Sequence, residues 1–229
     1  MWGNWGDPDE PSSDSRADGS PDVAAARERL VDRLAERSDV EREATLAALR
    51  AVPRHEFVTA SQRDHAYEDR PLPIDEGQTI SAPHMVAIMT DALALAPADR
   101  VLEVGTGCGY HAAVTAEVVD DGAVYSVEYE SALAADARDR LDRLGYDVAV
   151  RVGDGREGWP AHAPYDAAYL TCAPSAVPDP VIEQVRPGGR VVAPVGTARQ
   201  RLVRLVRRAD GSVEREDLGG VRFVSMQGG

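Results

Sequence analysis

The sequence contains no lysine. Its 25 basic residues are all arginines, and 39 aspartates and glutamates outnumber them, so the formal net charge is −14. Nucleic acids and anionic membranes bind basic surfaces, and this balance argues against either as the main partner. A carboxylate-rich surface is typical of proteins that stay soluble in a salty, halophilic cytoplasm, and we expect salt adaptation. A GC-rich genome, which favours arginine over lysine, is the alternative explanation.

Cysteine and long apolar runs are scarce as well. Cys108 and Cys172 are the only cysteines, and together with the five histidines they show no spacing typical of metal ligands. No window approaches the ~20 apolar residues that span a membrane, and residues 1–21 lack the apolar core of a secretory signal. We therefore expect a cytoplasmic protein with free thiols, no metal and no membrane contact.

Residues 1–22 are mainly Gly, Pro, Ser and Asp, a composition that predicts a disordered acidic tail. The remaining residues, 23–229, are enough for a single domain with a full core. Leucines recur at helical spacing between residues 23 and 49. This spacing predicts two helices separated near Ser38–Asp39, where the Ser or Asp side chain would cap the second helix.

Strands and helices alternate after residue 97. The expected strands lie at 100–104, 123–128, 147–152 and 167–171, and the expected helices at 112–119, 133–144 and 181–185. A turn at 187–189 leads into a further strand at 190–194, and residues 202–206 and 221–224 are expected to be closing strands. This alternation predicts an α/β fold with a doubly wound, mainly parallel sheet, helices on both faces and an N-terminal helical extension.

A glycine loop follows the first of these strands, in the segment Val-Leu-Glu-Val-Gly-Thr-Gly-Cys-Gly-Tyr at 101–110. In a doubly wound sheet the ligand binds beyond the carboxyl ends of the strands, beside the first strand. Gly105, Gly107 and Gly109 let the backbone turn tightly and approach a ligand closely. The spacing alone is also compatible with nicotinamide enzymes.

Acidic residues near the loop favour S-adenosylmethionine over a dinucleotide. Glu103 lies inside the first strand, where dinucleotide-binding folds usually carry an apolar residue. Glu128 ends the second strand, where its carboxylate can accept both ribose hydroxyls. Asp154 stands between two glycines after the third strand and can accept the adenine amino group. The alternative for Asp154 is an ordinary turn residue.

The segment Gln-Thr-Ile-Ser-Ala-Pro-His-Met at 78–85, preceded by Pro-Leu-Pro-Ile at 71–74, resembles the protein-L-isoaspartate O-methyltransferase family. The resemblance runs in order over three quarters of the chain, and its other motifs lie at 102–110, 153–155, 163–166, 186–190, 194–196 and 221–224. It implies a Rossmann-like methyltransferase fold. Residues 23–96 would form the helical and substrate-loop part, and residues 97–229 the cofactor-binding core.

The resemblance implies methyl transfer from S-adenosylmethionine to the α-carboxylate of L-isoaspartyl residues in damaged peptides and proteins. The ester then reverts to a succinimide, and repeated cycles restore Asp. By the same resemblance Ser81 is catalytic. We expect Pro73, Ile74, Ser81 and Arg222 to contact the peptide substrate. The implied cofactor contacts are Thr79, Ile80, His84, Glu103, Gly105, Thr106, Gly107, Gly109, Glu128, Asp154 and Gly155.

Simpler structural roles exist for three of these residues. Ser81 is also placed to cap a helix that has Pro83 in its first turn. His84 near a helix start is often structural, and Arg222 is equally compatible with an ordinary edge-strand arginine.

The sequence departs from the family pattern at two places. Asp75 stands where the family usually has Gly, which would be costly if that position needs a positive φ. Cys108 replaces a small hydroxyl residue in the glycine loop. If the first and fourth strands are neighbours, Cys108 and Cys172 could face each other as a redox-sensitive pair; two unrelated small residues are the alternative.

Two other functions stay open at this stage. One is methylation of another acceptor on the same fold. The other is a non-catalytic module that binds S-adenosylmethionine and recognises modified chains, which only Asp75 suggests. We expect a monomer, because no long apolar helix face is left over once the sheet is covered.

Overall fold

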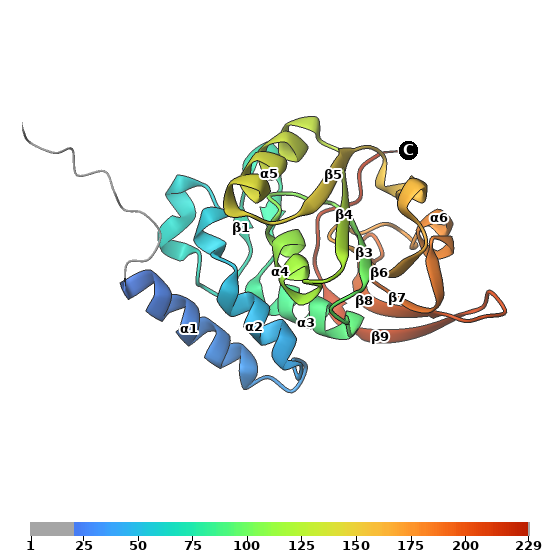
Figure 1. Ribbon diagram of the computed structural model, residues 1–229, viewed down its shortest axis with the longest axis horizontal. Coiled ribbons are helices and arrows are strands. Elements are labelled where there is room, and N and C mark those ends of the chain that lie inside the picture. The colour runs from blue at the N-terminus through green and yellow to red at the C-terminus, as the bar shows by residue number, and fades with distance from the viewer. Residues whose placement is uncertain (1–20, 229) are drawn as a thin grey trace, which may run out of the picture.

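The computed structural model describes residues 21–228 of the chain (Figure 1). The predicted acidic tail lies outside these residues except for its last two, which open helix α1 (Pro21–Ala35). Helix α2 (Glu43–Ala51) follows, so the two predicted N-terminal helices are confirmed. Figure 1 shows α1 and α2 as a pair, and α2 in turn contacts α3 (Pro83–Leu93) and α4 (Tyr110–Val118).

A seven-stranded sheet forms the centre of the molecule. Its order is β5-β4-β3-β6-β7-β8-β9. The strands β3 to β7 run parallel, and β8 and β9 are antiparallel additions at one edge. The strands are β3 (Arg100–Val104), β4 (Ala123–Glu128), β5 (Val148–Val152), β6 (Tyr165–Leu170), β7 (Val185–Val195), β8 (Gln200–Arg207) and β9 (Val213–Val221). The predicted doubly wound, mainly parallel sheet is confirmed.

Each face of the sheet has its own apolar core, because successive side chains of a strand point to opposite faces. Val101 of β3 belongs to the core shared with α2, α3, α4 and α5 (Ser131–Leu144). Leu102 belongs to the core that includes Val181 of α6 (Asp179–Glu183). Helix α5 ends at Gly145, which adopts a left-handed conformation (φ 81°), as the glycine predicted.

A two-stranded sheet precedes the main sheet in the chain. Strands β1 (Leu72–Pro73) and β2 (Thr79–Ile80) pair antiparallel and are joined by a 3₁₀ turn at Asp75–Gly77. The positive φ angles of this turn fall on Glu76 (55°) and Gly77 (67°), not on Asp75. The concern that Asp75 occupies a position that requires glycine is therefore wrong.

The cap of α2 differs from the prediction. Neither Ser38 nor Asp39 caps the helix; Asp39 instead binds the guanidinium of Arg37. The carboxylate of Asp91, on α3, accepts the backbone N–H groups of Glu41 and Arg42 at 3.2 and 2.9 Å. It also accepts the Thr45 hydroxyl at 3.0 Å. A residue about 50 positions away in the sequence thus satisfies the helix terminus, which no local pattern could indicate.

Two strand boundaries were also predicted wrongly. Residues 187–189, expected as a turn, lie inside β7, which pairs with β6 in two segments separated by a register shift. A Cβ at Gly189 would lie only 2.5 Å from the backbone oxygen of Asp166, so this irregular stretch requires glycine. The last strand is β9 at 213–221; of the strand expected at 221–224, only Val221 belongs to it, and residues 222–224 follow its end.

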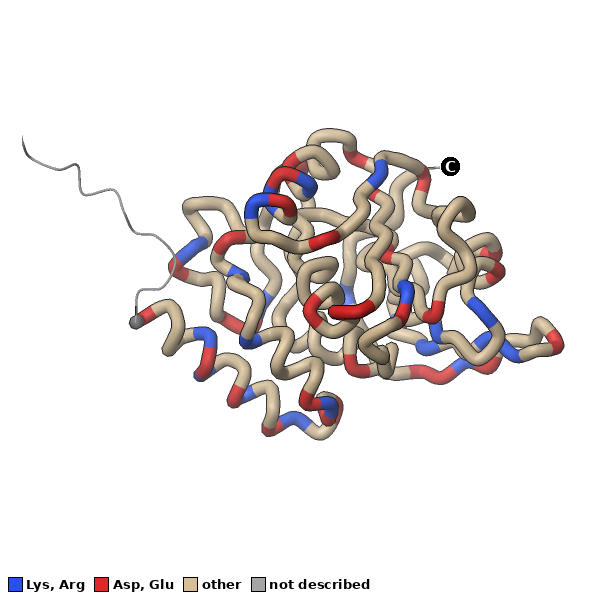
Figure 2. The backbone as a smooth tube through the Cα atoms, in the orientation of Figure 1, with Lys and Arg blue, Asp and Glu red and all other residues tan. Residues whose placement is uncertain are grey.

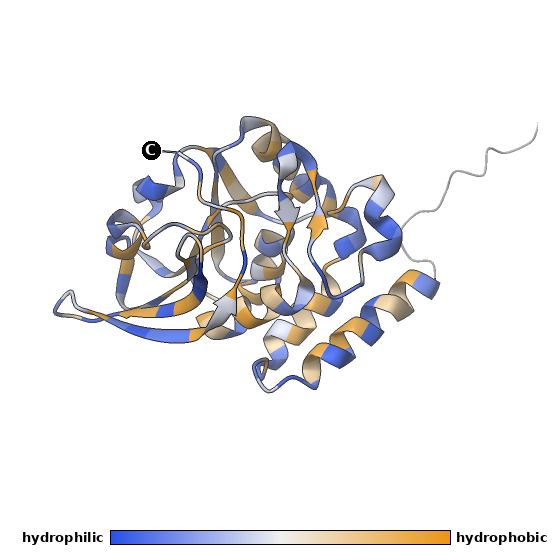
Figure 3. Ribbon diagram, turned by 180° about the vertical axis from the view of Figure 1, so that it is seen from behind, coloured by the Kyte–Doolittle hydropathy of each residue, from blue (hydrophilic) through white to orange (hydrophobic). Residues whose placement is uncertain are grey.

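The charged sequence of β9 explains the second error. Figure 2 shows acidic residues and arginines interleaved along the β8–β9 hairpin, and Figure 3 shows that the outer strand is largely hydrophilic. Most of β9 is exposed, so it has no apolar alternation to reveal it. Charges on an edge strand discourage pairing with other chains.

We expect Asp91→Ala to lower the free energy of unfolding by about 1–2 kcal/mol, the usual cost of losing a helix cap. Urea unfolding of the variant and the parent chain measures this difference. Asp64→Ala, at an exposed position where no residue in the range 21–228 donates a hydrogen bond to the carboxylate, is the matched control. Equal stability of the two variants would show that the tertiary cap contributes nothing.

Candidate functional site

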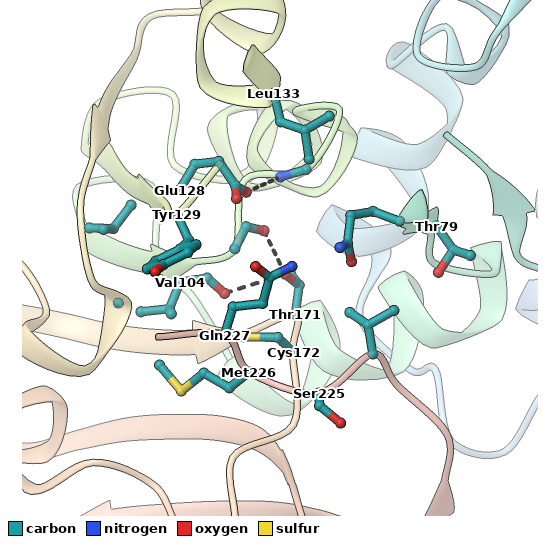
Figure 4. A pocket seen from close by; sticks show the side chains of 16 residues that line it. Thr79, Val104, Glu128, Tyr129, Leu133, Thr171, Cys172, Ser225, Met226 and Gln227 are labelled. Carbon is teal, nitrogen blue, oxygen red and sulfur yellow. Dashed lines mark hydrogen bonds between the residues drawn. The ribbon is translucent and has the colours of Figure 1, made fainter. Parts of the chain in front are cut away.

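A hollow opens at the carboxyl ends of β3, β4 and β6, where the fold places ligands. We call it the first hollow; it encloses about 570 Å³, part of it open to solvent. Figure 4 shows Glu128, Tyr129 and Leu133 on one side and Thr79 on the other. The other lining residues are Gln78, Val104, Gly105, Gly107, Val127, Gly155, Thr171, Cys172, Val224, Ser225, Met226 and Gln227.

The glycine loop forms one wall of the first hollow. Gly105, Gly107 and Gly109 all have positive φ angles, of 96°, 54° and 89°. A Cβ at Gly105 would collide with the hydroxyl of Thr171, which donates a hydrogen bond to the Gly105 carbonyl at 2.5 Å. Glycine is thus required both for the backbone conformation and for the approach of the chain that follows β6.

Glu128 holds the loop from the neighbouring strand. One carboxylate oxygen accepts the backbone N–H of Gly107 at 2.8 Å, and the other accepts that of Glu130 at 3.0 Å. The residue is only 7% exposed, and it lines the first hollow. Each carboxylate oxygen can accept a second hydrogen bond, so Glu128 can also bind hydroxyl groups in the hollow.

Glu103 does not line the first hollow, and its assignment as a cofactor contact is wrong. Its side chain points to the opposite face of the sheet from Val104 and is fully buried. It accepts hydrogen bonds from Ser126 (2.5 Å) and Tyr169 (2.9 Å). These residues stand directly opposite it on β4 and β6.

Ser126, Glu103 and Tyr169 form a row of hydrogen-bonded polar side chains across β4, β3 and β6, and this polar row continues to the glycine loop. Ser126 also pairs with the hydroxyl of Thr106 at 2.5 Å, and Thr115 of α4 donates to Tyr169 at 3.0 Å. Burial raises the pKa of Glu103 to about 8, because no solvent stabilises its charge; the two hydrogen bonds offset part of this effect. The carboxyl therefore keeps its proton to a higher pH than a solvent-exposed glutamate, and its hydrogen bonds connect β3 to β4 and β6.

Asp154 forms local hydrogen bonds. One of its carboxylate oxygens accepts the backbone N–H of Arg156 at 2.9 Å, and the other lies 3.5 Å from the Arg156 guanidinium. Asp154 thus caps the turn at Gly155–Glu157, and the neighbouring Gly155 lines the first hollow. The contact of Asp154 with adenine stays a prediction.

A second hollow adjoins the first and shares Thr79, Thr171, Val224 and Ser225 with it. It encloses about 1940 Å³, part of it open to solvent, and Ser81, His84 and Arg222 line it. The N-cap of α3 is Ala82, with no side-chain cap, so Ser81 does not have the capping role that was its alternative.

His84 lies on this second hollow and not on the first. Its Nδ1 is 2.8 Å from the carboxylate of Asp69, which also accepts the His84 backbone N–H at 2.9 Å. Asp69 therefore fixes the imidazole ring, and His84 lies on the same side as Ser81. The contact of His84 with the cofactor stays a prediction.

The remaining predicted residues lie around the glycine loop. Ile80 and Thr106 line a small hollow next to it, together with Ser81. Ile74 lines another with Cys108, and Pro73 is exposed in β1 and lines none of the hollows described for residues 21–228.

Several lining residues were not predicted. Thr171 and Cys172 follow β6 at the same sheet edge as the glycine loop, and that position was a usable signal. Tyr129 and Leu133 follow β4 in the same way. Met226 and Gln227 had no such signal. They line the hollow because the preceding residue, Ser225, pairs with Ala173 in an isolated β-bridge.

The two thiols line different hollows: Cys172 the first, and Cys108 two smaller ones. Their strands are neighbours, as predicted. Burial raises the pKa of Cys108, and it raises the pKa of Cys172 to about 12. A raised pKa disfavours the reactive thiolate, which argues against a redox role.

The sequence and the structure were compared with known proteins. The family model for protein-L-isoaspartate(D-aspartate) O-methyltransferase matches residues 25–229. The chain belongs to this family. Protein-L-isoaspartate O-methyltransferase 2 of Archaeoglobus fulgidus is 52% identical over 209 residues, which cover 90% of this chain and 95% of that protein.

Solved structures agree with this assignment. One protein-L-isoaspartate O-methyltransferase matches with a TM-score of 0.82 at 32% identity, over 88% of this chain and 66% of that one. A Plasmodium falciparum structure in complex with S-adenosyl-L-homocysteine has a TM-score of 0.76 at 21% identity, over 88% of this chain and 98% of that one; it supports the fold. The family resemblance and the fold that we expected from the sequence are confirmed. The cofactor of this chain is S-adenosylmethionine.

The buried carboxyl of Glu103 predicts a pH dependence of stability. Folded, Glu103 keeps its proton up to about pH 8; unfolded, it loses the proton above about pH 4.5. Unfolding therefore releases a proton within this window, and the free energy of unfolding falls as the pH rises through it, by at most about 1.4 kcal/mol per pH unit.

Glu103→Gln has no proton to release, so the parent chain should lose stability relative to it between about pH 5 and about pH 8. Urea unfolding at several pH values and constant salt measures the difference. Glu183→Gln removes an exposed carboxylate and is the control. If both variants follow the parent at every pH, Glu103 is not the group that titrates.

Proposed function

We propose that this chain methylates the α-carboxylate of L-isoaspartyl residues in damaged proteins, with the cofactor in the first hollow and the peptide in the second. The observation that carries this proposal is the wall that the hollows share. Thr79 and Thr171 line both, and Ser81 lies just beyond Thr79 in the second. A methyl group held at this wall is within reach of an acceptor beside Ser81.

The residues of the first hollow suit S-adenosylmethionine. The backbone of Gly105 and Gly107 allows a close approach, and the Glu128 carboxylate accepts the ribose hydroxyls. Thr79 and Gly155 complete the contacts on the remaining sides. The cofactor supplies a methyl group on a sulfonium, which is a good leaving group.

The second hollow needs to position a nucleophile rather than to create one. An α-carboxylate is already ionised at neutral pH, so no general base is required. The Ser81 hydroxyl donates a hydrogen bond to one carboxylate oxygen and directs the other toward the shared wall. Fixed geometry of this kind can lower a barrier by roughly 7–11 kcal/mol.

We assign His84 to the peptide side of the site. When Nδ1–H donates to the Asp69 carboxylate, Nε2 is the nitrogen left for the substrate. Arg222 lines the second hollow as well and belongs to the same side. Ile74 packs against Gly107 of the glycine loop and lines a separate small hollow, so we assign it no contact beside His84.

Ser81→Ala should lower kcat/KM for an isoaspartyl peptide by about ten- to hundredfold, the effect of losing a hydrogen bond to a charged group. Binding of S-adenosylmethionine, measured by calorimetry, should change little. Ser131→Ala, at an exposed position at the start of α5, is the control. An undiminished rate would remove Ser81 from catalysis.

Glu128→Gln should weaken the binding of S-adenosylmethionine about tenfold or more, because a charge-assisted hydrogen bond becomes a neutral one. Calorimetry with S-adenosylhomocysteine gives the Kd without turnover. The thermal unfolding midpoint of the variant must stay near that of the parent, since Glu128 also holds the glycine loop. Unchanged affinity would exclude Glu128 from the cofactor site.

The decisive assay uses paired isoaspartyl and aspartyl peptides with radiolabelled S-adenosylmethionine. Base-labile label in the isoaspartyl peptide alone supports repair. Label in neither peptide, despite cofactor binding, would favour another acceptor or a non-catalytic recognition module.

We further propose that the protein works in a salty cytoplasm. The excess of 39 acidic over 25 basic residues supports a protein that works in a salty cytoplasm, so the assay includes low and molar salt. Among residues 21–228, no helix is long and apolar enough to cross a membrane.

A further inference from the structure

The second hollow is basic in an otherwise acidic chain. About one residue in six is Asp or Glu, so about three would be expected by composition among the 18 residues that line this hollow. None of the 18 is acidic, and three are arginines: Arg199, Arg201 and Arg222. Elsewhere acidic residues and arginines are interleaved, as Figure 2 shows for α1.

Two of the three arginines have no carboxylate partner within the described part of the chain. Arg201 is held by Asp217, with its Nε 2.8 Å from one carboxylate oxygen and its Nη2 2.8 Å from the other. Arg199 and Arg222 are exposed and form no ion pair or side-chain hydrogen bond with any residue in the range 21–228. Their guanidinium groups are available to a ligand in the hollow.

The backbone holds these two arginines on adjacent segments. Arg199 lies in the turn between β7 and β8, and Arg222 directly follows β9. The residues next to them are joined by a pair of hydrogen bonds: the Gln200 amide accepts from the Phe223 backbone N–H at 2.6 Å and donates to the Phe223 carbonyl at 3.1 Å. The backbone positions of Arg199 and Arg222 are thus fixed relative to each other, and their side chains extend from two joined segments.

We propose that Arg199 and Arg222 make this methyltransferase selective for isoaspartyl peptides that carry further carboxylates next to the damaged residue. The inference rests on the proposed function, because it takes the second hollow as the peptide site. Guanidinium groups bind carboxylates through paired N–H donors. Without them, the net charge of −14 would repel acidic substrates.

The test compares three isoaspartyl peptides that differ only in the residues flanking the isoaspartate, which are Glu, Gln or Lys. The ratio of kcat/KM for the Glu peptide to that for the Gln peptide measures the selectivity. The parent chain should prefer the Glu peptide, and Arg199→Gln and Arg222→Gln should each lower the ratio by about two- to fivefold, the usual effect of one exposed ion pair. Raising the salt concentration should lower the ratio in the parent.

Arg215→Gln is the matched control, because it removes the same charge from exposed β9 without lining the hollow. It should leave the ratio unchanged. Equal rates on all three peptides, a preference for the Lys peptide, or equal effects of all three substitutions would overturn the selectivity while leaving the repair activity intact. Transfer to none of the isoaspartyl peptides would instead overturn the proposed function, and the selectivity with it.

Discussion

The arrangement of the site depends on the hydrogen bonds of the Glu103 carboxyl. It lies in the middle strand of three, and its partners Ser126 and Tyr169 stand directly opposite it on the two neighbouring strands. A buried polar group that loses a partner costs about 1–3 kcal/mol, so the register of β3 against β4 and β6 is strongly constrained. The row reaches the glycine loop through Thr106 and α4 through Thr115. Two contacts therefore hold the glycine loop to the sheet: Thr106 bonds to Ser126 of this row, and the Gly107 backbone N–H donates to Glu128.

The two hollows differ in charge in the way the reaction requires. Glu128 gives the first hollow a carboxylate, whereas the second contains arginines and a histidine and no acidic residue among its lining. The donor is a cationic sulfonium and the acceptor an anionic carboxylate, and both charges disappear when the methyl group moves. A site shielded from water favours such a step, because less solvation is lost in the transition state.

The strands and helices of the core were predictable because their signals are local. Strands β3 and β4 have the predicted bounds, and α5 ends at the predicted glycine, since apolar runs and glycines mark these positions. The glycine loop and Glu128 followed from the position of a strand end. The errors fall where the determining partner is distant: α2 is capped from α3 by Asp91, and β9 is a charged edge strand defined only by its pairing with β8.

The positions of the Glu103 and His84 side chains were hard to predict for a similar reason. Glu103 and Gly105 are two residues apart, yet only the glycine lines the first hollow, because Glu103 is buried inside β3 whereas Gly105 lies just beyond the end of the strand, where the chain turns with a positive φ. Thr79 lines both hollows, while His84, five residues later, lines the second alone and is bound to Asp69, 15 residues before it. A sequence motif thus identifies which residues act together. The ligand that each side chain faces depends on the turn from β2 into α3 and on partners outside the motif.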